Sequence, residues 1–302
     1  MMQLEVQYDV IVVGGGHAGA EAALASARYG ARTLLVSMRG DEIACMPCNP
    51  AVGGIAKSHL VFELDALGGE MARNSDYTGI QFRVLNTRKG PAVRANRVQC
   101  DKFAYASRMA AVVQITPGLD ILEDAVRSLD IRNGSLRGII LGDGSPVPGK
   151  SVVITPGTYL NGRIHIGDKV HAGGRGDMPS SDSLSDSLTG LGLEMARLKT
   201  GTPPRLHRDS IDYGKLEPQP GNEPPPFFSW EARRDAEMFH VEHLKDDSQD
   251  VGGEATNANA AEKAMFHVEH RNDLERESRE TESETPPQRT AGEVEGRDCL
   301  RP

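Results

Sequence analysis

Two cysteines and a glycine-rich turn are the residues whose types and spacing could do chemistry in this chain. Cys45 and Cys48 stand three positions apart in "ACMPCNP". Thiols at this spacing can hold zinc, form a redox pair or provide a nucleophile. Zinc would need two more soft or imidazole ligands, and the sequence has no second Cys-x-x-Cys. Zinc is therefore the weakest hypothesis, while a redox pair, a nucleophile and inert thiols stay open.

The glycine turn lies inside "YDVIVVGGGHAGAEAALASARYGARTLLVS", which predicts strand, turn, helix and strand. The predicted strands are Asp9–Val13 and Thr33–Ser37, and Gly14, Gly16 and Gly19 form G-x-G-x-x-G between them. Glycines here let the backbone approach a pyrophosphate, which the free N–H groups of the helix start then hold. The pattern favours a dinucleotide site over a turn without a ligand.

One part of the dinucleotide fingerprint is missing. An acidic residue about 20 positions on should accept hydrogen bonds from the ribose. The second strand instead ends at Ser37, with Asp41 and Glu42 slightly late. The sequence leaves the ribose contact unassigned.

Two turn signals further on, Asn133-Gly134 and Asp143-Gly144, separate apolar runs and predict a β-meander. The meander ends in a strand, Ser151–Thr155, before Gly157 and Thr158. A βαβ unit, a meander and a returning strand predict an α/β fold with a Rossmann-like domain of the two-dinucleotide flavoprotein type. By analogy with proteins of that fold, this order favours FAD over NAD as the tightly held cofactor.

The charge is concentrated at one end of the 302 residues. Residues 1–230 carry 24 acidic and 24 basic side chains, so the net charge of −9 arises in residues 231–302. Only 11 of those 72 residues are Val, Ile, Leu, Met, Phe, Trp or Tyr. This predicts a disordered acidic tail. No apolar run reaches about 18 residues, and four cysteines do not suggest a disulfide framework, so we expect a cytoplasmic protein without a membrane span.

Several long blocks then resemble one family: "DVIVVGGGHAGAEAA", "CNPAVGGIAKSHLVFELDALGG", "GIQFRVLNTRKGPAVRANRVQCD", "GTYLNGRIHIG" and "RLKTGTPPRL". They are similar to the tRNA uridine 5-carboxymethylaminomethyl modification enzymes, also called glucose-inhibited division protein A. The resemblance implies an FAD enzyme that modifies carbon 5 of the wobble uridine of tRNA, with NADH as reductant. It also implies a homodimer and a GTP-hydrolysing partner protein, together forming a heterotetramer.

The resemblance also assigns site residues. It places FAD on Gly14, Gly15, Gly16, His17, Ala18, Gly19, Val126 and Ser180. Carbon 5 of uracil becomes nucleophilic once a thiolate adds at carbon 6, so the useful cysteine must be reachable by a flipped-out base and easily ionised. Cys48 matches the Cys-Asn-Pro cysteine of the family and precedes a helix expected from about His59 to Leu67. Cys48 is the predicted nucleophile, with Cys45 incidental and no metal site.

The chain departs from the family after Trp230. Family members are roughly twice as long, and they continue with a second reactive cysteine and a helical domain that have no match here. We therefore predict an incomplete FAD-binding domain (1–200), the start of an inserted second domain (201–230) and the tail (231–302). A truncated fragment that binds nucleotide or partner without modifying tRNA is the alternative function. A general FAD or NAD oxidoreductase acting on a small molecule is a third.

Two further patterns have open interpretations. A basic strip, with one acid in 20 residues, could meet tRNA phosphates, meet the cofactor's pyrophosphate or be ordinary solvated surface; it consists of Arg83, Arg88, Lys89, Arg94, Arg97 and Lys102. Lys199 and Arg205 are equally open between anion binding and structure. The hexapeptide MFHVEH, which occurs twice in the tail, could bind zinc weakly, dock a partner or be a translated palindromic DNA site without a peptide role.

Overall fold

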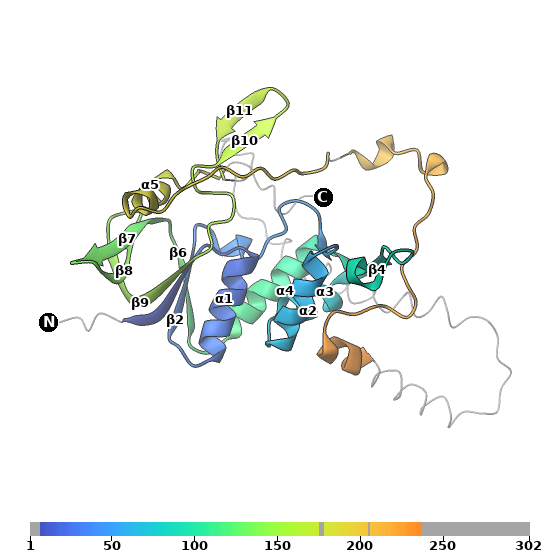
Figure 1. Ribbon diagram of the computed structural model, residues 1–302, viewed down its shortest axis with the longest axis horizontal. Helices are drawn as coiled ribbons and strands as arrows, with labels where there is room; N and C mark the ends of the chain where they lie inside the picture. Colours follow the sequence, from blue (N-terminus) through green and yellow to red (C-terminus); the bar gives the residue numbers. More distant parts are fainter. Residues whose placement is uncertain (1–6, 175–177, 205, 237–302) are drawn as a thin grey trace, which may run out of the picture. The chain divides into compact units, whose positions relative to one another are not determined.

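The computed structural model describes residues 7–174, 178–204 and 206–236. Its main sheet has six strands in the order β6-β2-β1-β9-β8-β7 (Figure 1). The first four run parallel, and β8 and β7 extend the sheet antiparallel. The bounds are β1 Tyr8–Val13, β2 Thr33–Ser37, β6 Leu119–Glu123, β7 Val126–Arg132, β8 Ser135–Leu141 and β9 Pro146–Ile154. The predicted α/β fold and β-meander are both confirmed.

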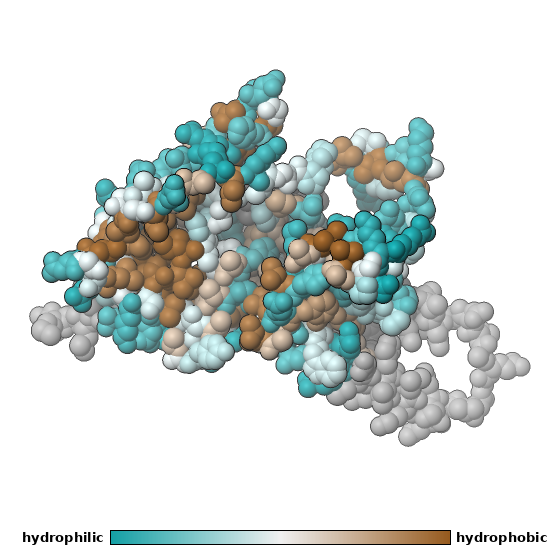
Figure 2. Space-filling view, viewed as in Figure 1, coloured by the Kyte–Doolittle hydropathy of each residue, from teal (hydrophilic) through white to brown (hydrophobic). Residues whose placement is uncertain are grey.

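Helices cover both faces of this sheet. On one face lie α1 (His17–Arg28) and α4 (Lys102–Ile115), and on the other α5 (Asp182–Gly190) packs against β7. The small side chains of α1 make close packing possible, since Ala20 and Ala23 are fully buried beside Leu24. Figure 2 shows apolar side chains gathered over the meander and α5, where partly buried aliphatic residues surround the core between the main sheet and α5.

A smaller sheet, in the order β3-β5-β4, lies beside α2 and α3. These elements are β3 Ala51–Gly53, α2 Lys57–Ala66, α3 Met71–Tyr77, β4 Gly79–Leu85 and β5 Ala95–Cys100. A separate hairpin consists of β10 Arg163–Ile166 and β11 Lys169–Ala172. Single 3₁₀ turns occupy Gly40–Glu42, Pro91–Val93, Arg208–Ser210 and Tyr213–Lys215.

A buried charge cluster joins α1 and α4, which cover the main sheet, to α3, which lies beside the smaller sheet. Glu21 of α1 accepts hydrogen bonds from the backbone N–H groups of Glu70 and Met71, where α3 begins. The Glu70 carboxylate, almost fully buried, pairs with Arg28 at 2.7 Å and Arg108 at 2.9 Å. Because buried carboxylates are stable only when their oxygens are satisfied, this cluster fixes α3 against α1 and α4.

Residues 217–230, here called the strap, run along β4 and end on α3. Asn222 N–H donates to Phe82 O and its side-chain oxygen accepts from Val84 N–H, both at 2.8 Å. The buried Asp76 then accepts from the N–H groups of Phe228 and Ser229. These hydrogen bonds hold the strap against β4 and α3, although the strap is far from both in the sequence.

The prediction of a disordered tail from residue 231 differs from the structure at its start, because residues 230–236 are helical. Both MFHVEH copies and Cys299 lie outside the described residues. The proposed boundaries at residues 200 and 230 stay predictions. No helix in the described ranges is long and apolar enough to cross a membrane.

Candidate functional site

The glycine loop joins β1 to α1 in a conformation that side chains would block. Gly14 has φ +105°, and its N–H donates to Val36 O at 2.8 Å. A Cβ on Gly19 would collide with the Gly14 carbonyl oxygen and lie 2.8 Å from Thr155 Oγ1. That hydroxyl bonds the carbonyl oxygens of Val13 and Gly14 at 2.9 and 3.0 Å. The contacts place the start of α1 directly over the end of β1.

A cavity of about 270 Å³, here called the glycine-loop pocket, opens beside this turn. Its walls come from the ends of β1 and β2, the turn after β9 and the start of α5. The predicted residues that line it are Gly14, Gly15, Gly16, His17 and Val126. Ala18 and Gly19 lie in the first turn of α1 and do not line it. Ser180 does not line it either: its hydroxyl donates to Asp182, and Ser181 lines the pocket instead.

The start of α1, where His17 lines this pocket, has backbone donors without partners inside the helix. Ala20 N–H is the first to bond back into the turn, to Gly16 O at 2.9 Å. The three preceding N–H groups of α1 have no carbonyl partner within the helix. Gly16 has no side-chain cap, and the space where its Cβ would stand is open. This arrangement fits the pyrophosphate of a dinucleotide.

An acidic residue that the sequence left unassigned also lines the glycine-loop pocket. Glu42 is half-buried in the wall, whereas Asp41 is exposed and is not a lining residue. Arg39 pairs with both, at 2.8 Å to Asp41 and 3.8 Å to Glu42. The 3₁₀ turn after β2 brings Glu42 back to the pocket. The acidic residue that the dinucleotide fingerprint expects would then come later in the sequence than its usual spacing.

A second cavity, about 350 Å³ and here called the thiol pocket, lies on the other side of His17. His17 and Pro47 line both cavities, so the two adjoin. Burial lowers the pKa of His17, which therefore stands as a neutral imidazole between them. Its ring lies 5.5 Å from the buried ring of Tyr105 on α4.

The three described cysteines have different surroundings, and none is in a disulfide. Cys48 is exposed and lines the thiol pocket together with Lys57 and Leu60 of α2. Cys45 is buried and lines the glycine-loop pocket. Cys100 is buried, and desolvation raises its pKa to about 11. Among the cysteines of the described ranges, Cys48 is thus the accessible thiol, and its predicted role as nucleophile stays a prediction.

One side chain approaches the thiol pocket from a distant segment of the sequence, and one helix begins beside it. Thr202 Oγ1 lies 3.7 Å from Cys48 Sγ, within hydrogen-bond reach of sulfur. α2, expected from about His59, begins at Lys57 beside the same pocket. No group of three or more His, Cys, Asp or Glu side chains in the described part of the chain is placed to hold a metal ion.

Five residues of the basic strip lie on one hairpin. Arg83 is on β4, Arg97 is on β5, and Arg88, Lys89 and Arg94 occupy the connection between them. Lys102 departs from this group because it begins α4. None of the six lines the glycine-loop pocket. Lys199 is exposed, and Arg205 lies outside the described residues.

A parallel sheet whose glycine loop opens α1, with a meander that returns to the same pocket, defines the fold of a Rossmann-like FAD-binding domain. Residues 9–278 match the family described as glucose inhibited division protein A. The chain belongs to this family.

Named relatives agree with this assignment. The tRNA uridine 5-carboxymethylaminomethyl modification enzyme MnmG of Pelobacter propionicus is 52% identical over 255 residues, covering 83% of this chain and 40% of that protein. The enzyme of the same name from Bacillus subtilis is 53% identical over 225 residues, covering 74% and 36%. The solved structure of Aquifex aeolicus GidA superposes with a TM-score of 0.72 at 48% identity, covering 74% of this chain and 37% of that one. The chain thus spans about two fifths of the length of these relatives.

Proposed function

We propose that this chain is the FAD-binding part of an enzyme that adds a carboxymethylaminomethyl group to carbon 5 of the wobble uridine in tRNA. The names of the relatives give this activity. The observation that carries the proposal is the shared wall of the two pockets, formed by His17 and Pro47. A nucleotide cofactor held at the glycine loop would lie next to a base held against Cys48.

Most site residues have a role in this proposal. Gly14, Gly15, Gly16, His17, Ala18 and Gly19 form the FAD-binding turn, with Val126 from a later segment. Ser180, the other residue that the resemblance assigns, does not line the pocket, and its neighbour Ser181 takes that place. The N–H groups at the start of α1 hold the pyrophosphate, and Glu42 accepts from the ribose. The bound FAD supplies redox chemistry. Neutral His17 separates the two ligands without placing a charge between them.

Cys48 acts on the base. Its thiolate adds at carbon 6 of uracil, and the ring electrons move to carbon 5. Carbon 5 then attacks the carbon of an iminium ion, whose C=N electron pair passes to nitrogen. Loss of the proton from carbon 5 and departure of the thiolate restore the aromatic ring. By resemblance to the family, NADH would be the reductant for a bound flavin. A GTP-hydrolysing partner would join a homodimer of this protein in a cytoplasmic heterotetramer.

The experiment separates cofactor binding from chemistry on the base. FAD is titrated into the chain by flavin fluorescence, and exchange of the carbon 5 hydrogen is followed in D₂O with a tRNA transcript carrying a wobble uridine. This exchange needs only reversible addition of the thiolate at carbon 6. We expect micromolar or tighter FAD binding and exchange that Cys48→Ser abolishes.

The other outcomes identify the rival functions. FAD binding without exchange would support a non-catalytic fragment. Exchange that survives Cys48→Ser would remove the role of Cys48. Failure to bind FAD would overturn the assignment of the glycine-loop pocket.

A further inference from the structure

The β4–β5 connection carries a concentration of positive charge that the FAD site does not use. We call Arg83, Arg88, Lys89, Arg94 and Arg97 the basic hairpin. The strands pair antiparallel, with Arg83 directly opposite Arg97. The other three residues of the basic hairpin, Arg88, Lys89 and Arg94, are exposed in the connection between the strands. Like charges directly opposite on a sheet destabilise it unless a counter-charge is present.

The paired arginines lie on the outer face of the smaller sheet. The neighbouring pair, Phe82 and Val98, packs into the core, and successive side chains of a strand alternate between faces. Arg83 and Arg97 therefore lie on the opposite face. There Arg83 donates to the neutral side-chain oxygen of Gln219 in the strap at 2.6 Å.

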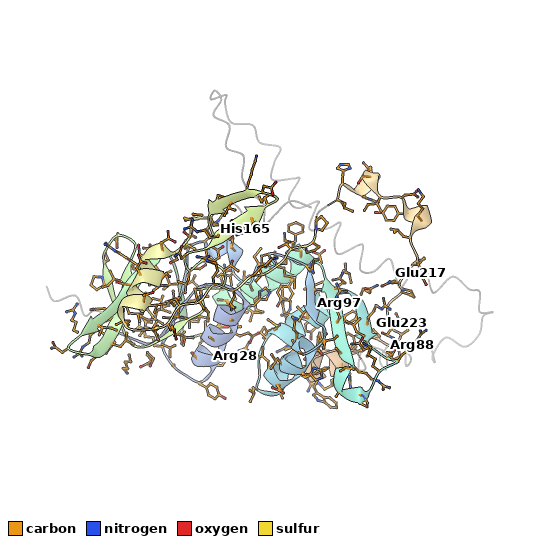
Figure 3. The ribbon with its side chains drawn as sticks, turned by 45° about the horizontal axis from the view of Figure 1, so that its top comes forward. Arg28, Arg88, Arg97, His165, Glu217 and Glu223 are labelled. Atoms are coloured by element: carbon orange, nitrogen blue, oxygen red, sulfur yellow. The ribbon has the colours of Figure 1, made fainter. Side chains whose placement is uncertain are left out.

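No carboxylate in the described ranges forms an ion pair with the basic hairpin. The strap carries Glu217 and Glu223 past it, and Figure 3 labels both with Arg88 and Arg97. Five positive side chains against two acids leave a net positive surface. Since the hairpin does not line the glycine-loop pocket, the cofactor's pyrophosphate is not its counter-charge.

The hairpin is connected to the thiol through the smaller sheet. β5 pairs with β4 on one side and β3 on the other, so Arg97 is opposite both Arg83 and Gly53. Cys48 precedes β3 by only three residues. Gly53 also lines the thiol pocket, so an anion held at Arg97 lies on the strand that neighbours this pocket.

We propose that the basic hairpin binds the phosphate backbone of the RNA substrate and so presents the wobble base to the thiol pocket. This inference rests on the proposed function. Guanidinium groups suit this task because their planar donors match phosphate oxygens, and backbone contacts of this kind position a nucleic acid without reading its sequence.

The test uses the full chain, loaded with FAD, and a fluorescein-labelled transcript of a tRNA with a wobble uridine. Dissociation constants are measured from 50 to 300 mM KCl for wild type and for Arg88→Glu/Arg94→Glu. The matched control is Arg127→Glu/Arg137→Glu, which changes the same net charge at exposed positions of the meander. FAD affinity is measured for all three proteins.

We expect the hairpin variant to bind the transcript roughly tenfold or more weakly, with a slope of log K against log salt reduced by about 1.5–2. The control variant should match wild type, and all three should bind FAD equally. If both variants lost the same affinity for the transcript, the loss would come from the change in net charge alone, and the proposal would be overturned. A hairpin variant that binds like wild type would also overturn it, as would a wild-type chain that binds FAD but not the transcript. Loss of FAD binding in wild type would instead count against the proposed function.

Discussion

Thr202 Oγ1 lies 3.7 Å from Cys48 Sγ, although 154 positions separate the two residues. Thr202 belongs to the extended, exposed segment that carries the family-like block "RLKTGTPPRL". The contact brings that block next to the thiol, with the Thr202 hydroxyl placed to donate a hydrogen bond to sulfur.

The first prediction concerns thiol reactivity. In a Cys299→Ser background, iodoacetamide should modify Cys48 first, because Cys45 and Cys100 are buried. Thr202→Val keeps the size of the side chain but removes the donor, so we expect alkylation of Cys48 to slow severalfold. Mass spectrometry of the digested protein measures both. Faster modification of Cys45 would contradict the assignment of the accessible thiol.

The second prediction contrasts two glycines of the same loop. Gly19→Ala should destabilise the protein by about 3 kcal/mol, because the new Cβ would overlap the Gly14 carbonyl. Gly16→Ala should leave the unfolding free energy nearly unchanged, since Gly16 has φ −69° and open space at its Cβ position. It should still weaken FAD binding, because that space belongs to the pocket. Urea unfolding and flavin titration distinguish the two effects, and equal destabilisation by both substitutions would contradict the geometry.

The third prediction tests the ribose contact. Glu42→Ala should weaken FAD binding about tenfold, the value of one charge-assisted hydrogen bond. FMN affinity should change much less, because FMN lacks the adenosine ribose. Asp41→Ala is the control, since Asp41 also pairs with Arg39 but does not line the pocket. If both substitutions weaken FAD equally, the effect belongs to Arg39 rather than to Glu42.

Local sequence patterns predicted the parts of the fold that local interactions determine. The strand over Thr33–Ser37 matches β2, and the Asn133-Gly134 signal falls on a turn where both residues have positive φ. The helix expected from about His59 begins two residues earlier, at Lys57. Turn residues and apolar runs act over a few residues, so they can be recognised in the sequence without tertiary information.

The site was less predictable because it depends on long-range packing. Cys45 and Cys48 are three residues apart but line different pockets, and no spacing rule separates them. Glu42 reaches the glycine-loop pocket because of a 3₁₀ turn, and no sequence motif predicts that turn. The contact of Asp76 with Phe228 and Ser229 spans about 150 residues, and only the folded strap reveals it.

The last prediction concerns the pH dependence of stability. Burial raises the pKa of Asp76 to about 7, and nearby Asp65 adds to the rise. Hydrogen bonds from the N–H groups of Ser229 and Phe228, together with Arg233, oppose it but are weaker. The folded state therefore holds the proton more tightly than the unfolded state, whose Asp76 has a pKa near 3.8. The stability from this group is fully present below about pH 4 and is lost as pH rises to about 7.

Asp76→Asn removes this titration while keeping a side-chain oxygen for the strap. The unfolding free energy of wild type relative to the variant should fall by roughly 2–4 kcal/mol between pH 4 and pH 8. Urea unfolding across that range measures the difference, with Glu231→Gln as an exposed control from the residues that follow the strap. A difference that grows with pH would show that the two N–H donors outweigh burial, and Asp76 would then stabilise the strap as a carboxylate.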